Sequence, residues 1–185
     1  MRRLFDLIFA VMFFPAVILL IILCSIAIAV LEGRPIFFKS ERLGKNQKSF
    51  TIIKLRTMSI CAPLVPSCHQ NASEHVTKLG CFLRLTSLDE LPQIFNVLNG
   101  DMTLIGPRPC LSSEFELVER RERENIFSMT PGVTGLAQVR GRDKNSPRKK
   151  VHYESFYLKK KSLLFDLKII VITMRAVFKF SDVSH

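Results

Sequence analysis

Two adjacent acidic residues, Asp89 and Glu90, occur where carboxylates could do chemistry. They lie in the segment from Thr86 to Gln93 (TSLDELPQ), in which Ser or Thr precedes an acidic residue by three positions, a spacing typical of a helix start. The helix dipole and free N–H groups would hold a carboxylate ionised there. An ionised Asp89 could attack phosphorus as a nucleophile, and Glu90 could hold Mg²⁺. The alternative is that both carboxylates only stabilise the helix start.

Attack on a diphosphate also requires cations, because negative charge spreads over the transferring group. Five basic residues stand in segments where the backbone is constrained, and Arg108 lies between two prolines that would fix its direction. Each of them alone could be an ordinary surface charge, because the chemistry requires that they converge in space. The candidates are Lys54, Arg56, Arg84, Arg108 and Arg142.

The segments around these residues predict short elements, more of them helical than extended. Two strand-like stretches flank a turn signal at Gly44 to Asn46, which favours a β-hairpin. Apolar residues then recur at helical spacing, and Asn99-Gly100 stops one such run. The sequence therefore predicts an α/β fold, mostly helical with a small β-hairpin or sheet. The expected elements are strands at 35–38 and 49–55, helices at 78–85, 88–98, 114–125 and 163–180, a loop at 59–76 and a turn at 131–135.

Residues Leu7 to Leu31 form an apolar run of 25 residues without a formal charge. As a helix it would be about 37 Å long, which exceeds the roughly 30 Å hydrocarbon core of a bilayer. Three interpretations compete: a cleaved signal peptide, a simple spanning helix, and a helix that enters the membrane and returns to the same face. Pro15 predicts a kink, and both flanks are basic, which is compatible with a same-side return.

Composition agrees with a membrane-bound domain. The chain has 185 residues, 48% of them apolar, and a net charge of +11, with a mean hydropathy of +0.21. These values exclude a disordered chain and fit an ordinary soluble enzyme poorly. We expect a membrane-inserted helix at 1–33 and a membrane-associated cytoplasmic catalytic domain at 34–185. Five cysteines form an odd, irregular set, which indicates a reducing compartment.

The basic residues concentrate between Arg140 and Lys161, with nine Lys or Arg against two acids. Few aromatic residues accompany them, so anionic lipids or a phosphorylated substrate are favoured over nucleic acid. No common nucleotide-binding, zinc-protease or serine-hydrolase motif occurs. Cys61, Cys68 and His69 lack a second ligand pair, so a zinc site is not expected there.

Several blocks of the sequence together resemble the bacterial sugar transferase family, the monotopic phosphoglycosyl transferases that begin the assembly of lipid-linked glycans. Any one block is weak, but the same order over essentially the whole chain, apolar segment included, is specific. The length is similar to that of small members without extra membrane spans. The blocks are Lys54 to Met58, Thr86 to Gln93, Gly100 to Met102, Gly106 to Pro109, Pro131 to Val139 and Gly141-Arg142.

The resemblance implies transfer of a sugar-1-phosphate from a UDP-sugar to undecaprenyl phosphate or another polyprenyl phosphate, with release of UMP. This would be the first membrane step in making an O-antigen, capsule, exopolysaccharide or glycoprotein glycan. Asp89 matches the nucleophile that forms a covalent aspartyl-phosphosugar, and Glu90 matches the Mg²⁺ ligand. The substrate- and phosphate-binding candidates are Lys54, Arg56, Arg84, Arg108, Arg142 and Gln138.

The resemblance also implies a re-entrant anchor broken at Pro15, amphipathic helices on the membrane surface, and a catalytic domain on the cytoplasmic face of the bacterial inner membrane. A homo-oligomer is compatible with the sequence. Thr130 and Glu154 depart from the family pattern in a region expected to touch nucleotide or sugar, which leaves the sugar open. The rival functions are a membrane-associated hydrolase of nucleotide-sugar or lipid diphosphates and a non-enzymatic basic membrane adaptor.

Overall fold

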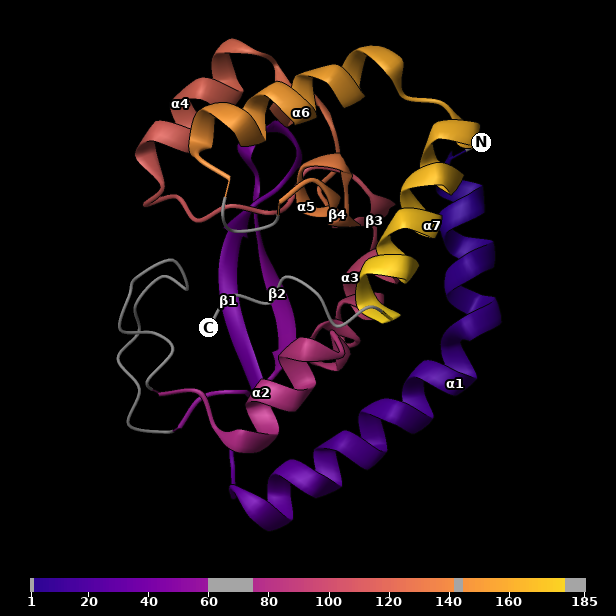
Figure 1. The fold of residues 1–185 in the computed structure, drawn as a ribbon, viewed down its shortest axis with the longest axis vertical. Coiled ribbons are helices and arrows are strands. Elements are labelled where there is room, and N and C mark those ends of the chain that lie inside the picture. Colours follow the sequence, from indigo (N-terminus) through magenta and orange to yellow (C-terminus); the bar gives the residue numbers. More distant parts are fainter. Residues whose placement is uncertain (1, 60–74, 142–144, 179–185) are drawn as a thin grey trace.

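The computed structural model describes residues 2–59, 75–141 and 145–178, and it consists mostly of helices with two small sheets (Figure 1). Arg142 and the segment with Cys61, Cys68 and His69 lie outside the described residues. The helices are α1 (Arg2–Leu31), α2 (Lys78–Leu85), α3 (Gln93–Asn99), α4 (Phe115–Arg123), α5 (Leu136–Val139), α6 (Pro147–Lys160) and α7 (Leu163–Phe178), with 3₁₀ turns η1 (Lys45–Gln47), η3 (Leu88–Glu90) and η4 (Ile126–Ser128). The strands are β1 (Phe37–Leu43), β2 (Ser49–Leu55), β3 (Thr103–Ile105) and β4 (Gly132–Thr134).

The predicted β-hairpin is confirmed. Strands β1 and β2 pair antiparallel along their whole length, and the hairpin runs through the middle of the molecule (Figure 1). The amide of Gly44 donates to the carbonyl of Lys48 at 2.9 Å and closes the turn. Ile52 and Leu55 of β2 are both buried, but they point to opposite faces of the strand and belong to two different core clusters.

The predicted helix at 88–98 is divided into two elements, η3 and α3. Pro92 has no N–H to donate and interrupts regular helical bonding. The backbone bonds on either side span three residues, as in the bond from the Ile94 amide to the Leu91 carbonyl at 3.0 Å. Gly100, with φ of 91°, ends α3 in the left-handed region, as the sequence predicted. Helix α2 has the predicted bounds.

The prediction of a turn at 131–135 was wrong, because these residues contain a strand. Strand β4 pairs parallel with β3, from Thr103 opposite Gly132 to Ile105 opposite Thr134. A Cβ on Gly132 would lie 2.0 Å from the Gly106 amide, so the close approach of the two segments requires glycine. A strand of three residues is too short to show an alternating pattern, which is why only the turn signal was visible.

Helix α1 is continuous from Arg2 to Leu31 and is long and apolar enough to cross a membrane. It runs along one side of the domain and beneath α2 (Figure 1). Its buried residues are Asp6, Ala10, Ile21 and Ile28, while most of its large apolar side chains are exposed. Ala10 and Ile28 each belong to a separate core cluster with residues of the following domain. The helix therefore packs on the domain through one face and leaves the other face apolar and uncovered.

Helices α4 and α6 pack together at the opposite end of the hairpin from α2 (Figure 1), and α7 is joined to the start of α1 by an ion pair of 3.3 Å between Asp166 and Arg2. Helix α4 confirms the predicted charged helix, and α7 confirms the predicted apolar one within the described residues. The exposed apolar side chains of α7 are Leu163, Leu164, Leu167, Val171 and Met174.

Glu154 of α6, which the family resemblance places in a region expected to touch nucleotide or sugar, is buried and paired with a residue of α4. Its carboxylate accepts a hydrogen bond at 2.8 Å from Nε of Arg121 on α4, and a second from Nη2. Both side chains are only 3% exposed. The pair is part of the contact between two helices, which spacing along the chain could not reveal.

Candidate active site

Asp89 and Glu90 occupy the short 3₁₀ turn η3, between α2 and α3. The preceding Ser87 has φ of 58°, a left-handed conformation that turns the chain between these elements. The expected capping bonds do not form. Ser87 makes no side-chain cap, and the Thr86 hydroxyl donates back to the Phe82 carbonyl at 2.8 Å. Thr86 therefore closes the end of α2 instead of opening the next helix.

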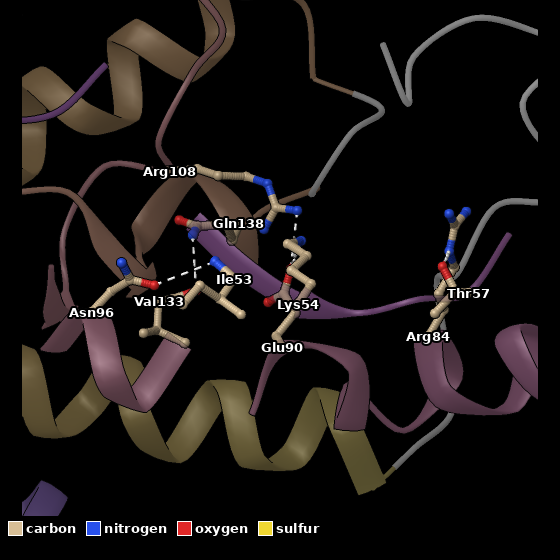
Figure 2. Close-up of polar contacts among 9 residues, drawn as sticks. All are labelled: Ile53, Lys54, Thr57, Arg84, Glu90, Asn96, Arg108, Val133 and Gln138. Atoms are coloured by element: carbon tan, nitrogen blue, oxygen red, sulfur yellow. Dashed lines mark hydrogen bonds and ion pairs between the residues drawn. The ribbon is translucent and has the colours of Figure 1, made fainter. Parts of the chain in front are cut away.

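Two basic side chains from distant parts of the chain converge on Glu90 (Figure 2). Lys54 of β2 places its Nζ 2.6 Å from Oε1 of Glu90, and Arg108, after β3, places Nη2 3.1 Å from the same oxygen. Burial of Glu90 opposes ionisation, but the two cations and their hydrogen bonds hold the pKa of Glu90 well below its usual range. Glu90 is therefore ionised at neutral pH.

Asp89 has the opposite electrostatic behaviour. Its side chain is buried, with a residue exposure of 8%. Burial and the neighbouring charge of Glu90 raise the pKa of Asp89 to about 6, although Lys54, Arg84 and Arg108 act in the other direction. The helix start therefore does not lower the pKa of Asp89, although this carboxyl is still mostly ionised at pH 7. A turn of three residues supplies little dipole, and desolvation outweighs it.

Arg84 lies to one side of this cluster and is held by Thr57 (Figure 2). Its Nε donates a hydrogen bond of 2.9 Å to the Thr57 hydroxyl. Thr57 was not recognised from the sequence, because a single threonine in a loop carries no pattern. Its only signal was its place in the block from Lys54 to Met58 that carries the family resemblance.

Asn96 is a second residue that sequence reasoning missed. Its amide bridges α3 to β2, since Nδ2 donates to the Thr51 carbonyl at 2.7 Å. Its Oδ1 accepts from the Ile53 amide at 3.4 Å (Figure 2). These bonds fix the strand that carries Lys54 against the helix that follows Glu90. A polar residue on an otherwise apolar helical stretch was the available signal.

Two further candidates, Arg56 and Gln138, form their hydrogen bonds away from Glu90. Arg56 points to the end of α1, where its Nη2 donates to the carbonyls of Glu32 at 2.8 Å and Gly33 at 2.9 Å. Gln138 of α5 donates from Nε2 to the Val133 carbonyl at 3.3 Å (Figure 2). Arg142 lies outside the described residues. The structure thus brings together Lys54, Glu90 and Arg108, with Asp89 and Arg84 within electrostatic reach of them.

A family model described as bacterial sugar transferase matches residues 1–180. The chain belongs to the bacterial sugar transferase family. This is a family of sugar-1-phosphate transferases, so the adaptor interpretation is not supported.

Relatives within the family differ in length and in their named sugars. The "Uncharacterized sugar transferase EpsL" of Bacillus subtilis is 40% identical over 96% of this chain and 87% of the relative. A UDP-glucose:undecaprenyl-phosphate glucose-1-phosphate transferase of Caulobacter vibrioides is 35% identical over 94% of this chain and 68% of the relative. A UDP-N-acetylgalactosamine-undecaprenyl-phosphate N-acetylgalactosaminephosphotransferase of Aeromonas hydrophila is 33% identical over 95% of this chain and 43% of the relative.

The raised pKa of Asp89 in this sugar transferase predicts a titration in an unusual range. Carboxyl ¹³C NMR of the metal-free protein should show one carboxyl with a midpoint near pH 6, which Asp89→Asn removes. Attack requires the ionised form, so turnover should rise as pH increases from 5 to 7. The matched control is Glu116→Gln, because Glu116 is exposed on α4 and should not affect this titration. A carboxyl midpoint near 4 for Asp89 would contradict the prediction.

Proposed function

We propose that this protein transfers a sugar-1-phosphate from a UDP-sugar to undecaprenyl phosphate and releases UMP, as the first membrane step in assembling a glycan. The observation that carries the proposal is the buried Asp89 beside the cluster of Lys54, Glu90 and Arg108, in a chain of this family. Relatives named for this reaction use UDP-glucose or UDP-N-acetylgalactosamine, so the sugar of this member stays open.

In the first step, a carboxylate oxygen of Asp89 attacks the phosphorus that carries the sugar. The bond between this phosphorus and the bridging oxygen breaks, and UMP leaves with the electron pair. A phosphosugar then remains on Asp89 as an acyl phosphate. In the second step, a phosphate oxygen of undecaprenyl phosphate attacks the same phosphorus, and Asp89 is regenerated as a carboxylate.

The basic residues explain how the chain supports this transfer. Lys54 and Arg108 are held in place by Glu90, at 2.6 and 3.1 Å, before any substrate binds. Cations that are already positioned stabilise the charge that spreads over the transferring phosphoryl group without rearranging during the reaction. Arg84 adds a third positive charge close enough to lower the pKa of Asp89 against the effect of burial. An anionic substrate beside Asp89 would raise its pKa further. The three cations oppose this effect and help to keep Asp89 ionised for attack.

The residues of the site fit Mg²⁺ as a cofactor. Both cations contact Oε1 of Glu90, which leaves Oε2 without a protein hydrogen bond among the described residues. The described chain has no group of three or more metal-binding side chains. Magnesium commonly uses one or two carboxylates and completes its shell with water and substrate phosphates, so Glu90 with a diphosphate would suffice. When bound, it would neutralise charge on the diphosphate.

We also propose that α1 enters the membrane, bends at Pro15 and returns to the cytoplasmic face. Near its start, Arg3 donates to the last carbonyls of α3, and near its end Ile28 packs into a core cluster with α2 and β2. A folded domain stays on one side of a bilayer, so docking of both helix ends on it supports a same-side return. Pro15 lacks a backbone donor, which lowers the cost of a bend there.

A labelling experiment tests this topology. In a cysteine-free variant, a cysteine inserted before Arg2 should be labelled from the cytoplasmic side, like a control cysteine at the exposed Lys149 of α6. Labelling of the inserted cysteine only from outside the membrane would refute the same-side return.

The activity is tested with purified protein, Mg²⁺, undecaprenyl phosphate and a panel of UDP-sugars, with UMP release as the measurement. One UDP-sugar should give continuous UMP release that stops when Mg²⁺ is chelated. Without undecaprenyl phosphate, release should stop after one equivalent. Continuous turnover with water as the acceptor would instead indicate the rival hydrolase, and inactivity on every UDP-sugar would count against the transferase proposal.

A further inference from the structure

Arg84 differs from the other cations of the site in what it binds. Lys54 and Arg108 both contact the carboxylate of Glu90, whereas Arg84 makes no ion pair with a described residue. Its one hydrogen bond uses Nε, so its two Nη groups make no hydrogen bond with the described residues and point away from Thr57 (Figure 2). A guanidinium with both Nη groups presented in this way can bind a phosphate through two parallel bonds.

Thr57 is itself held rigidly at the end of the hairpin. It is only 7% exposed, and its carbonyl accepts a hydrogen bond of 3.1 Å from the Thr77 amide at the start of α2. A Cβ on Gly80, in the first turn of α2, would lie 2.0 Å from the Thr57 carbonyl oxygen. The Thr57 backbone therefore packs directly on the helix that carries Arg84, and the hydroxyl has a fixed place relative to it.

We propose that Thr57 is a positioning residue, which orients the Arg84 guanidinium so that its two Nη groups bind one phosphate of a substrate. This inference rests on the proposed function and deepens it, because it names the residue that orients Arg84, a phosphate-binding candidate that forms no ion pair with Glu90. The phosphate could belong to the UDP-sugar or to undecaprenyl phosphate, and the chemistry of recognition is the same for both.

The central test compares Thr57→Val, which keeps the shape but removes the acceptor, with Thr57→Ser, which keeps it. Loss of a hydrogen bond to a charged group should raise the KM for one of the two substrates about tenfold, with a smaller change in kcat. Thr57→Ser should restore the KM to within about threefold of the wild type. The substrate whose KM rises identifies the phosphate that Arg84 binds.

Binding of inorganic pyrophosphate, measured by calorimetry, tests the inference without turnover. Thr57→Val should weaken this binding about tenfold, and Thr57→Ser should not. Failure of the wild type to turn over any UDP-sugar would refute the proposed function, but this binding comparison would still judge Thr57. Thr57→Ala provides a second variant without the hydroxyl if Thr57→Val does not fold.

Two controls separate positioning from a general loss of structure. Thr173→Val removes the bond between Thr173 and Thr134 hydroxyls, 2.8 Å apart on α7 and β4, and should leave KM and pyrophosphate binding unchanged. In an Arg84→Lys background there is no Nε for Thr57 to accept from, so Thr57→Val should have no further effect. Unchanged KM values and pyrophosphate affinity in Thr57→Val, or an equal effect in the Arg84→Lys background, would overturn the inference.

Discussion

Replacement of Asp89 by Asn should abolish sugar-1-phosphate transfer while making the protein more stable. Loss of a covalent nucleophile should lower kcat by at least about 10³-fold, because the remaining cations bind the diphosphate but cannot form the acyl phosphate. Mass spectrometry of the wild type with UDP-sugar alone should detect a phosphosugar on Asp89, and the variant should show none. Glu116→Gln also removes one negative charge, but from an exposed side chain, and it should keep full activity. Full activity in Asp89→Asn would eliminate the covalent mechanism.

The stabilising effect of the same change follows from the pKa of Asp89. Burial raises the pKa from 3.8 to about 6, so the folded protein favours the protonated acid. The stability associated with this proton is complete below about pH 4 and is lost as pH rises through about 6. Asparagine has no such loss, so the free energy of unfolding at pH 8 should be about 3 kcal/mol higher in Asp89→Asn. The two proteins should be nearly equal at pH 4, and chemical denaturation at both values measures the difference.

Replacement of Glu154 by Gln should have the largest effect on stability. Arg121 and Glu154 are each 3% exposed, so the change would leave a buried guanidinium without its counter-charge. Breaking such a pair typically costs about 3–5 kcal/mol, a large part of the stability of a small domain. The double variant Arg121→Met/Glu154→Leu should recover most of this loss, because it removes both charges. Thermal unfolding measures all three proteins.

A matched surface pair provides the control for Glu154. Arg120 and Glu116 on α4 are 2.9 Å apart but exposed, so Glu116→Gln should change the unfolding midpoint very little. At a temperature where Glu154→Gln is still folded, its KM for the UDP-sugar should equal that of the wild type. A KM change without loss of stability would instead support the implication of the family resemblance that Glu154 touches the substrate.

Local patterns were sufficient for elements whose signals lie close together in the chain. The hairpin followed from two β-rich stretches around Gly44, and α2 has the bounds that the sequence predicted for a short helix. Local patterns failed where a single residue or a distant partner decided the secondary structure. Pro92 divided the expected helix, and β4 exists only because it can pair with β3 through a glycine contact.

The sequence by itself determined the family, the apolar helix and the two carboxylates that chemistry requires, since each is a matter of residue type and order. Only the tertiary structure decided how the charges act. Lys54 and Arg108 reach Glu90 from 36 and 18 residues away, and Arg56, from the same block as Lys54, turns instead to the end of α1. The pKa of Asp89 likewise depends on burial and on charges from other segments. Such effects arise from distances in space, which spacing along a chain does not specify.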